Sequence, residues 1–308
     1  MNREIEWKTL NFEFKMDSIV TEKIRENASL NREDDCLHYY ELANALFSYI
    51  NSKKLPISIG IYGKWGSGKS VLVNFMQEIC EEDTECEFIK FDAMSFSGDQ
   101  NNLFWSLMAK IIEKKDKGIT GGWTKMVKSC AKVVSTFSEN AGTIAKAIGG
   151  FLSDEQARSF LVEKTKIFEK DNKKYIVVID NIDRLTPKAA INFLEKIKVF
   201  LLSESGTLLK NFVYLIPCDF EILHAEVREI YRNNSLDARD YLNKLIEVPF
   251  YLPQQQDGLI ENLADSLMNQ DIDIGIRGRV WSVLKQFGLI VPRDIKNFLQ
   301  ELDMIFII

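Results

Sequence analysis

Histidine and paired cysteine are scarce in this sequence of 308 residues, which limits the metal chemistry open to it. There are two histidines, His38 and His224, and five cysteines, none of them in a C-x-x-C pair. A structural zinc site needs closely spaced ligands of these two types, so the sequence excludes one. The odd number of cysteines and the missing pairs favour reduced thiols.

Long apolar runs and an excess of positive charge are also missing. A membrane-spanning helix needs about 20 apolar residues, and charged residues interrupt every stretch of that length. The first residues, MNREIEWKTL, are charged and are not typical of a signal peptide. A net charge of −6 disfavours a dedicated nucleic-acid-binding protein, although it leaves room for a local basic groove. We therefore expect a cytoplasmic protein.

The segment GIYGKWGSGKSVLVN, residues 60–74, carries the strongest motif. Its residues 63–70, here called the glycine loop, fit the phosphate-binding pattern G-x-x-x-x-G-K-[ST]. Glycines let backbone N–H groups converge on phosphate oxygens, and the following helix adds its N-terminal dipole. The alternative is an ordinary glycine-rich turn. The predicted nucleotide-binding residues are Gly63, Lys64, Trp65, Gly66, Ser67, Gly68, Lys69, Ser70 and Val71.

Apolar runs alternate with helical patterns along most of the chain. Runs typical of buried strands lie at residues 55–62, 88–91, 175–179, 212–216 and 248–253. Helical spacing occurs at residues 38–50, 71–79 and 103–112, after a capping box at 153–156, from residue 186, and throughout the chain beyond residue 254. We predict an α/β fold of three layers around a central, mainly parallel sheet. The expected domains are a helical lead-in (1–54), a core (55–253) and a helical lid (254–308).

An aspartate follows the third expected strand directly. The run ending at residue 179 is followed by Asp180 and, three residues later, by Asp183. Open α/β sheets bind ligands at the carboxyl ends of their strands. We therefore expect Asp180 and Ser70 to hold Mg²⁺, with Asp183 near the same cleft, while Lys69 neutralises phosphate charge. The alternative for Asp180 is a solvated aspartate of the kind that ends strands in any α/β protein.

Taken together, these segments resemble the KAP family of P-loop NTPases, within the STAND and AAA-like ATPases. The similarity runs from about residue 38 to 300 and is carried by YYELANALFSYI, the glycine loop with its tryptophan, FDAMSF, VVIDNIDRL, YLNKLIEVPFYLP and VPRDIKNFL. The resemblance implies that the chain binds ATP with Mg²⁺ and hydrolyses ATP to ADP and phosphate.

The resemblance also assigns two further residues. Asp219 resembles a sensor position beside the γ-phosphate, and Arg293 resembles a lid arginine that reports on that phosphate. The alternatives are a helix N-cap for Asp219 and an ion-paired residue of the first helical turn for Arg293. Trp65 has no catalytic role in either interpretation, and we expect it to pack over the loop, the nucleotide or a partner.

Two positions depart from the family pattern. Where the family has a sequence like F-N-A-W, this chain has Phe91-Asp-Ala-Met94, and where the family has D-D-L-D-R it has Asp180-Asn-Ile-Asp-Arg184. Asn181 therefore stands where a second carboxylate would polarise the attacking water. An amide can orient water but cannot accept its proton. We expect slow hydrolysis unless Asp183 substitutes.

Residues 118–152 interrupt the alternation with an amphipathic helical pattern that has lysines on its polar side. Some members of the resembled family carry transmembrane helices at this place, but this insert is too polar to span a bilayer. A helical hairpin packed on the core or on a partner subunit is the favoured interpretation. A helix lying on an acidic membrane surface is the alternative.

Three functions remain open at this level. The first is a Mg-ATP-dependent switch of conformation or assembly, with self-association or a protein effector as its output. The second is an ATP-binding scaffold or signalling module with little hydrolysis, which Asn181 favours. The third, a nucleic-acid motor, is disfavoured by the charge. An anti-phage role follows from the resemblance, since the family includes phage-exclusion proteins. The apolar residues 304–308 either dock into the lid or continue into a longer protein.

Overall fold

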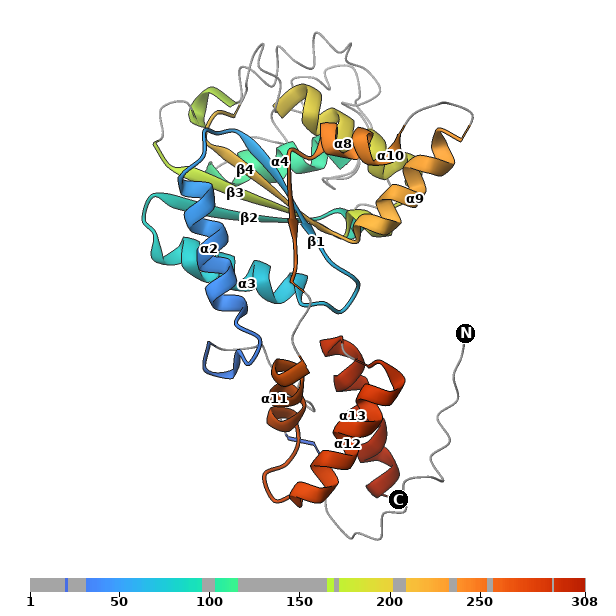
Figure 1. Ribbon diagram of the computed structural model, residues 1–308. Helices are drawn as coiled ribbons and strands as arrows, with labels where there is room; N and C mark the ends of the chain where they lie inside the picture. Colours follow the sequence, from blue (N-terminus) through green and yellow to red (C-terminus); the bar gives the residue numbers. More distant parts are fainter. Residues whose placement is uncertain are drawn as a thin grey trace, which may run out of the picture. The chain divides into compact units, whose positions relative to one another are not determined.

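The apolar runs expected to be strands form one sheet in the computed structural model, which describes residues 20–21, 32–95, 103–115, 165–168, 172–201, 209–232, 237–253, 257–289 and 291–307. The strands are β1 (Ile57–Tyr62), β2 (Cys86–Asp92), β3 (Lys174–Asp180), β4 (Phe212–Cys218) and β5 (Val248–Tyr251). Their order is β2-β3-β4-β1-β5, and each neighbouring pair is parallel (Figure 1). The predicted α/β fold with a mainly parallel sheet is confirmed.

Helices cover both faces of this sheet, as they must when parallel strands are joined by crossovers. Figure 1 shows α2 (Tyr39–Asn51) and α3 (Lys69–Glu82) together on one side of the strands. On the other side lie α4 (Leu103–Lys115), α8 (Pro187–Leu201) and α10 (Ala238–Leu245), with α9 (Phe220–Ile230) packed on α8 and α10. The result is a three-layer α/β/α arrangement.

Side-chain alternation divides the strands between the two helical layers. Phe91, Val177 and Ile179 belong to the apolar cluster that contains the buried residues of α4 and α8. Their neighbours in sequence point to the opposite face, where Lys90 of β2 donates to the Oδ1 atom of Asn74 on α3 (2.8 Å). Asp92 and Asp180 therefore end their strands on the face covered by α3.

The two central strands β1 and β4 are buried along their whole length, which explains their near-continuous apolar sequences. Each fully buried large apolar side chain stabilises the fold by about 1.5–3 kcal/mol. The edge strand β5 alternates between half-buried and exposed residues. Helix α8 begins at Pro187, whose fixed φ suits the first helical position.

The predicted helices at 38–50, 71–79 and 103–112 correspond to α2, α3 and α4 and are confirmed. Helix α3 begins at Lys69, two residues earlier than its apolar pattern suggested, because the end of the glycine loop already forms its first turn. The insert at 118–152 and the capping box at 153–156 lie outside the described residues, so their predictions stay open. Within the described ranges, no helix combines the length and the apolarity that crossing a bilayer requires.

The expectation of reduced thiols is wrong for two of the five cysteines. A disulfide joins Cys80, near the end of α3, to Cys86, the first residue of β2. Their Cα atoms are 5.3 Å apart because the chain reverses tightly between the helix and the strand. A separation of six residues without a C-x-x-C pattern gave no sign of this reversal. Cys218 is a buried free thiol, and Cys36 is a half-buried one.

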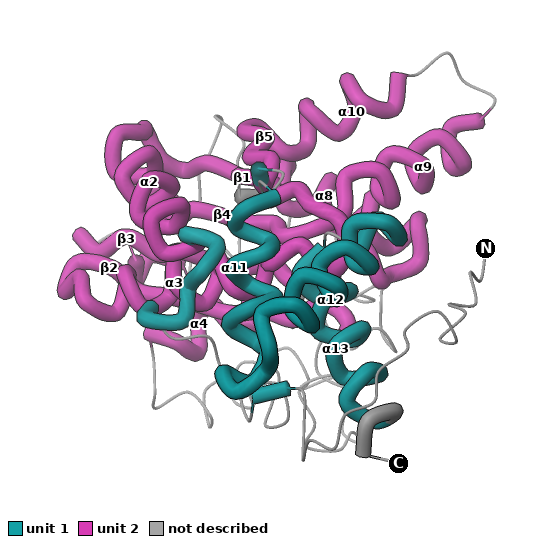
Figure 2. Tube along the Cα trace, turned by 60° about the horizontal axis from the view of Figure 1, so that its bottom comes forward, with its two compact units in different colours: residues 1–38, 253–308 teal, residues 39–252 magenta. Residues whose placement is uncertain are grey.

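The chain divides into two compact units, one of residues 39–252 and the other of residues 1–38 with 253–308 (Figure 2). The second contains the short 3₁₀ helix η2 (Arg32–Asp34) and the helices α11 (Asp257–Leu267), α12 (Ile274–Phe287) and α13 (Pro292–Ile307). Helices α11 to α13 lie in the stretch beyond residue 254, where the sequence predicted a helical pattern. In this unit Val20 forms an antiparallel bridge with Met268, and its N–H donates to the Oδ1 atom of Asp303 on α13 (3.4 Å).

Candidate functional site

The glycine loop connects the carboxyl end of β1 to the first turn of α3. Gly66 and Gly68 have φ angles of 86° and 91°, in the left-handed region that glycine adopts without a steric penalty. A Cβ atom at Gly68 would lie 2.4 Å from the ring of Tyr39. Backbone conformation and close packing thus both require glycine at position 68.

The ammonium group of Lys69 folds back over this loop. Its Nζ atom donates to the carbonyl oxygens of Gly63 (2.6 Å) and Lys64 (3.1 Å). The N–H of Gly63 donates to the carbonyl oxygen of Cys218 (3.2 Å), which ties the start of the loop to β4. The two carbonyl oxygens accept from the Lys69 ammonium without neutralising its charge. An anion that reached the ammonium would therefore bind it more strongly than they do.

Two further features of the loop fit an anionic ligand. The Oγ atom of Ser67 is buried, and it has no hydrogen-bond partner among the described residues. Gly68, the N-cap of α3, offers no side chain to satisfy the first N–H groups of the helix. Unpaired donors at a helix N-terminus bind phosphate groups in many proteins, so these residues fit a nucleotide phosphate.

Tyr39 of α2 supports the loop from outside the motif. Its hydroxyl donates to the carbonyl oxygen of Ser67 in a short hydrogen bond, and its buried ring fills the space that the missing side chain of Gly68 leaves. Sequence reasoning counted Tyr39 only as an apolar position of the helix. The signal that could have identified it is a hydroxyl-bearing ring on the buried stripe of the helix that precedes the loop.

Trp65 is 66% exposed, so the loop does not bury it. The guanidinium carbon of Arg184 lies 4.9 Å from the centre of its ring, within the range of a cation–π contact. Arg184 ends the short 3₁₀ helix η5 (Ile182–Arg184), which follows β3. Trp65 thus connects the glycine loop to the turn that carries the acidic residues.

The acidic residues form the second part of the site, here called the acidic edge: Asp92, Asp180, Asn181 and Asp183. Asp92 and Asp180 are partners in the β2–β3 register, so their strands end side by side. Burial raises the pKa of Asp180, and the nearby charges of Asp92 and Asp183 raise it further. The hydrogen bond from the N–H of Asn181 and the charge of Arg184 lower it, but by less. A cation beside Asp180 would stabilise its ionised form, which fits a Mg²⁺ ligand.

Asn181 links the two strands of this edge. Its Nδ2 atom donates to the Oδ1 atom of Asp92 (2.9 Å), which also accepts from the N–H of Met94 (3.1 Å). The other oxygen of Asp92 accepts from the hydroxyl of Ser95 (2.7 Å). Burial raises the pKa of Asp92, but the bonds from Ser95, Asn181 and the backbone outweigh burial and lower it. Asp92 was noted from sequence only as a departure from the family pattern, and its contact with Asn181 was missed.

Asp183 lies on the other side of the edge, toward β4 and α9. Its Oδ2 atom accepts from the N–H of Asp219 (2.8 Å). Burial raises the pKa of the Cys218 thiol, and the charge of Asp183 raises it further, while the charge of Lys69 lowers it. Asp183 also contributes, after burial, to raising the pKa of Glu226 on α9 to about 7. The structure therefore brings Asp183 close to the loop but uses one of its oxygens to hold the β4–α9 turn.

Asp219 is the N-cap of α9, because its Oδ1 atom accepts from the N–H of Glu221 (3.1 Å). This is the alternative that the sequence left open for Asp219, and a sensor role for it stays a prediction. Arg293 lies exposed in the first turn of α13. It belongs to the other compact unit, so its approach to the phosphates also stays a prediction.

Among the described residues, no group of three or more histidine, cysteine or carboxylate side chains could enclose a metal ion. Mg²⁺ at nucleotide sites is usually held by one or two protein ligands and by phosphates, and it keeps several waters. Ser70 in the first turn of α3 and Asp180 at the end of β3 stay the predicted pair of ligands.

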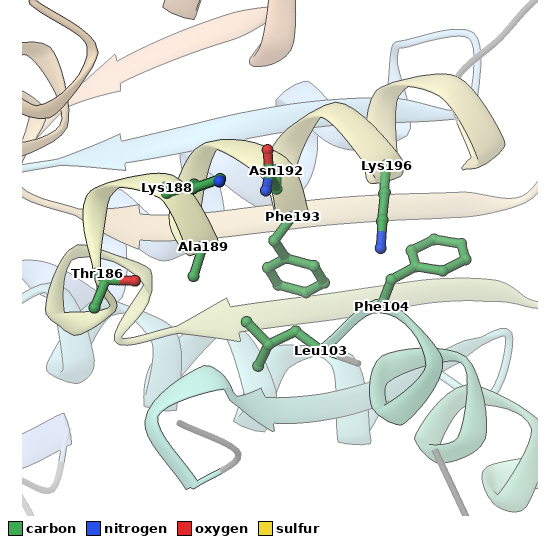
Figure 3. A pocket seen from close by; sticks show the side chains of 8 residues that line it. All are labelled: Leu103, Phe104, Thr186, Lys188, Ala189, Asn192, Phe193 and Lys196. Atoms are coloured by element: carbon green, nitrogen blue, oxygen red, sulfur yellow. The ribbon is translucent and has the colours of Figure 1, made fainter. Parts of the chain in front are cut away.

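A separate pocket of about 170 Å³ lies between α4 and α8 (Figure 3). Apolar side chains form one part of it and two lysines another, and none of its residues was predicted for the site. It is lined by Leu103, Phe104, Thr186, Lys188, Ala189, Asn192, Phe193 and Lys196. None of these residues belongs to the glycine loop or to the acidic edge, so the pocket is not part of the candidate nucleotide site.

Comparison with known proteins gives matches along most of the chain. The KAP family P-loop domain matches residues 39–306. A phage T7 exclusion protein of Escherichia coli (strain K12) is 23% identical in an alignment 292 residues long, which covers 80% of this chain and 38% of the exclusion protein. The chain thus spans 38% of the length of that curated relative.

Solved structures with a related arrangement of the chain share little sequence with it. The Aeropyrum pernix ORC1 protein, solved in complex with DNA, is 13% identical with a TM-score of 0.46, over 89% of this chain and 61% of that one. A Walker-type ATPase of Pyrococcus abyssi is 13% identical with a TM-score of 0.46, over 87% of this chain and 67% of that one. Similarity at this level says nothing about what this chain binds.

Proposed function

Because this chain belongs to the KAP family of P-loop NTPases, we propose that it binds ATP with Mg²⁺ and uses binding and slow hydrolysis to switch its conformation or assembly. The observation that carries the proposal is the glycine loop itself. Two of its glycines are in left-handed conformations, and the Lys69 ammonium folds over its carbonyl oxygens. A positive charge beside a loop with left-handed glycines supports the proposal, because a triphosphate requires a cation and converging backbone N–H groups.

Each predicted residue has a distinct part in this function. Lys69 exchanges its carbonyl partners for β- and γ-phosphate oxygens, and the N–H groups from Gly63 to Val71 hold the phosphate chain. Ser70 and Asp180 hold Mg²⁺, which supplies positive charge against the phosphates when bound. The Trp65–Arg184 contact keeps the loop and the acidic edge together.

The switch depends on a residue that distinguishes ATP from ADP, and Arg293 is our proposal for it. A guanidinium can bind a terminal phosphate through two parallel hydrogen bonds, which ADP cannot offer in the γ position. Helices α11 to α13 would then act as a lid whose state follows the nucleotide. The output would be self-association or contact with a protein effector.

An anti-phage role is supported by one relative, the phage T7 exclusion protein of Escherichia coli. The chain spans 38% of that protein, so the match does not extend to the remainder of the relative's sequence. We propose that this chain supplies the nucleotide-controlled part of such a defence. The second candidate, an ATP-binding scaffold with little turnover, is favoured by the amide at Asn181, which cannot accept a proton.

The experiment that tests the proposal measures binding and turnover on the same sample. We expect calorimetry with Mg²⁺ to show ATP binding at least about tenfold tighter than ADP, a difference of about 1.4 kcal/mol. We expect phosphate release well below the typical enzyme rate of about 10 s⁻¹. In Arg293→Ala, ADP affinity should stay near that of the wild type while the preference for ATP is lost.

Arg279→Ala serves as the matched control, because Arg279 is an exposed arginine of the neighbouring helix α12. The control should keep the preference for ATP. Equal losses for both nucleotides in Arg293→Ala, or no loss for either, would show that Arg293 is structural. Tight ATP binding with no phosphate release would favour the scaffold, and no nucleotide binding would reject both functions.

A further inference from the structure

The two departures from the family pattern meet in space, although 89 residues separate them in the chain. Asp92 ends β2 and Asn181 follows β3, and the register of these parallel strands places Asp92 opposite Asp180. The carboxylate and the amide therefore form one contact, Asn181 Nδ2 to Asp92 Oδ1, at 2.9 Å. The family pattern has asparagine at the position of Asp92 and aspartate at the position of Asn181. In this chain the two side-chain types are therefore exchanged.

An ionised carboxylate accepts hydrogen bonds and donates none. Beside Asp92, the Asn181 amide can form a hydrogen bond in one orientation only, with its nitrogen toward β2. Its oxygen is then left to accept from a donor other than Asp92. Asn181 directly follows Asp180, the proposed Mg²⁺ ligand, so a water of the proposed nucleotide site is such a donor.

Other contacts hold both members of this pair in place. Asp92 accepts from the N–H of Met94 and from the hydroxyl of Ser95, which fixes the carboxylate. The backbone of Asn181 is left-handed, with φ 58° and ψ 28°, a conformation that asparagine tolerates better than most residues. The amide is thus positioned by its own backbone and by an anchored partner.

We propose that Asp92 is a positioning residue for ATP hydrolysis: it fixes the Asn181 amide so that the amide oxygen accepts a hydrogen bond from the attacking water. The inference rests on the function proposed above. In this proposal two residues share the water-orienting role. Asp92, at the end of β2, carries the charge, and Asn181, which follows β3, carries the amide that touches water. Asp183, the substitute expected from sequence, instead holds the β4–α9 turn.

Hydrolysis of ATP by this route needs no proton acceptor in the protein. The water oxygen forms a bond to the γ-phosphorus, and the bond from that phosphorus to the β–γ bridging oxygen breaks, its electron pair leaving with ADP. The water proton goes to the phosphate product, since an amide oxygen orients water but does not take its proton. Asn181 holds the water in line, and Asp92 holds Asn181.

The test exchanges the two side chains. Asp92→Asn permits two orientations of the facing amides, so kcat should fall at least about fivefold with ATP affinity within about twofold of the wild type. Asn181→Asp places two carboxylates within hydrogen-bond distance, which should lower both kcat and the melting temperature without nucleotide. The double variant restores one donor and one acceptor, and both quantities should recover above either single variant.

Two further variants accompany this cycle. Asp240→Asn removes an exposed aspartate of α10 and should leave turnover and melting temperature unchanged. Asp183→Asn tests the rival carboxylate directly, and we expect a smaller fall in kcat than in Asp92→Asn. A larger fall in Asp183→Asn than in Asp92→Asn would assign the water to Asp183 and overturn the inference.

The remaining outcomes are also decisive. An unchanged kcat in Asp92→Asn, or a double variant no better than the weaker single variant, would overturn the inference while leaving ATP binding intact. Binding of ATP by the wild type without turnover would do the same. A wild type that binds no ATP would instead reject the proposed function, and the recovery of melting temperature would then show that the pair has a structural role only.

Discussion

The glycine loop and the acidic edge are the two parts of the site, and they are built in opposite ways. The loop is one continuous segment of eight residues, and its proposed function depends on its backbone and on Lys69. The edge is assembled from side chains at the ends of β2 and β3 and in η5, which are far apart in sequence. A backbone site is sensitive to conformation, whereas a side-chain site is sensitive to charge and to hydrogen-bond type.

This difference explains where the sequence can vary. In the loop, no side chain can take the place of Gly68 without moving Tyr39 or the backbone. At the edge, a donor and an acceptor can change strands and still form the same contact, as Asp92 and Asn181 do. A departure from a family pattern is therefore more serious in the loop than at the edge.

The largest effect should come from Gly68→Ala. Alanine at φ 91° is strained, and its methyl carbon would lie 2.4 Å from the Tyr39 ring. Strain of this kind costs about 1–3 kcal/mol. We expect the variant to lose that amount of unfolding free energy, or to abandon the loop conformation and bind ATP about 5- to 100-fold more weakly. Chemical denaturation measures the unfolding free energy, and calorimetry measures the ATP affinity.

Gly278→Ala is the matched control for this change. Gly278 is an exposed helical glycine of α12, and a Cβ atom there would meet nothing within 4 Å. Its replacement should stabilise the chain by about 0.5–1 kcal/mol, as alanine does in helix interiors. If Gly68→Ala lowered neither the unfolding free energy nor the ATP affinity, as we expect for Gly278→Ala, the loop would not be more sensitive to backbone conformation than the edge.

A smaller effect should come from Tyr39→Phe, which removes only the hydroxyl that donates to the carbonyl oxygen of Ser67. Loss of one such bond costs about 0.5–1.5 kcal/mol. We expect a lower melting temperature and ATP affinity reduced about two- to tenfold, since the loop loses its support. Tyr49→Phe, on the same helix α2 but exposed, should change neither. Equal results for the two variants would mean that Tyr39 only fills space.

The fold and the loop were predictable because their signals are local. Continuous apolar runs, a glycine pattern of fixed spacing, and Asp180 at a strand end all lie within short segments of sequence. The strands, the helices that follow them and the mainly parallel sheet were confirmed on that basis.

Contacts between distant segments were not predictable from one sequence. The bond between Asp92 and Asn181 depends on the β2–β3 register, and the bond from Asp219 to Asp183 depends on the packing of β4 beside β3. Tyr39 was hidden because the helical pattern shows which face is buried but not which buried hydroxyl has a polar partner. The Cys80–Cys86 disulfide joins residues only six positions apart, and it was missed because no pattern in the sequence signals the tight reversal between α3 and β2.

The central claim, that the glycine loop binds a nucleotide through Lys69, is tested most directly by calorimetry of Lys69→Ala with Mg-ATP. Lys110→Ala, which removes an exposed lysine of α4, is the control. We predict that Lys69→Ala lowers ATP affinity at least about tenfold, equivalent to about 1.4 kcal/mol, with little change in melting temperature without nucleotide. Lys110→Ala should bind like the wild type. ATP affinity in Lys69→Ala equal to that of the wild type would contradict the assignment of the site.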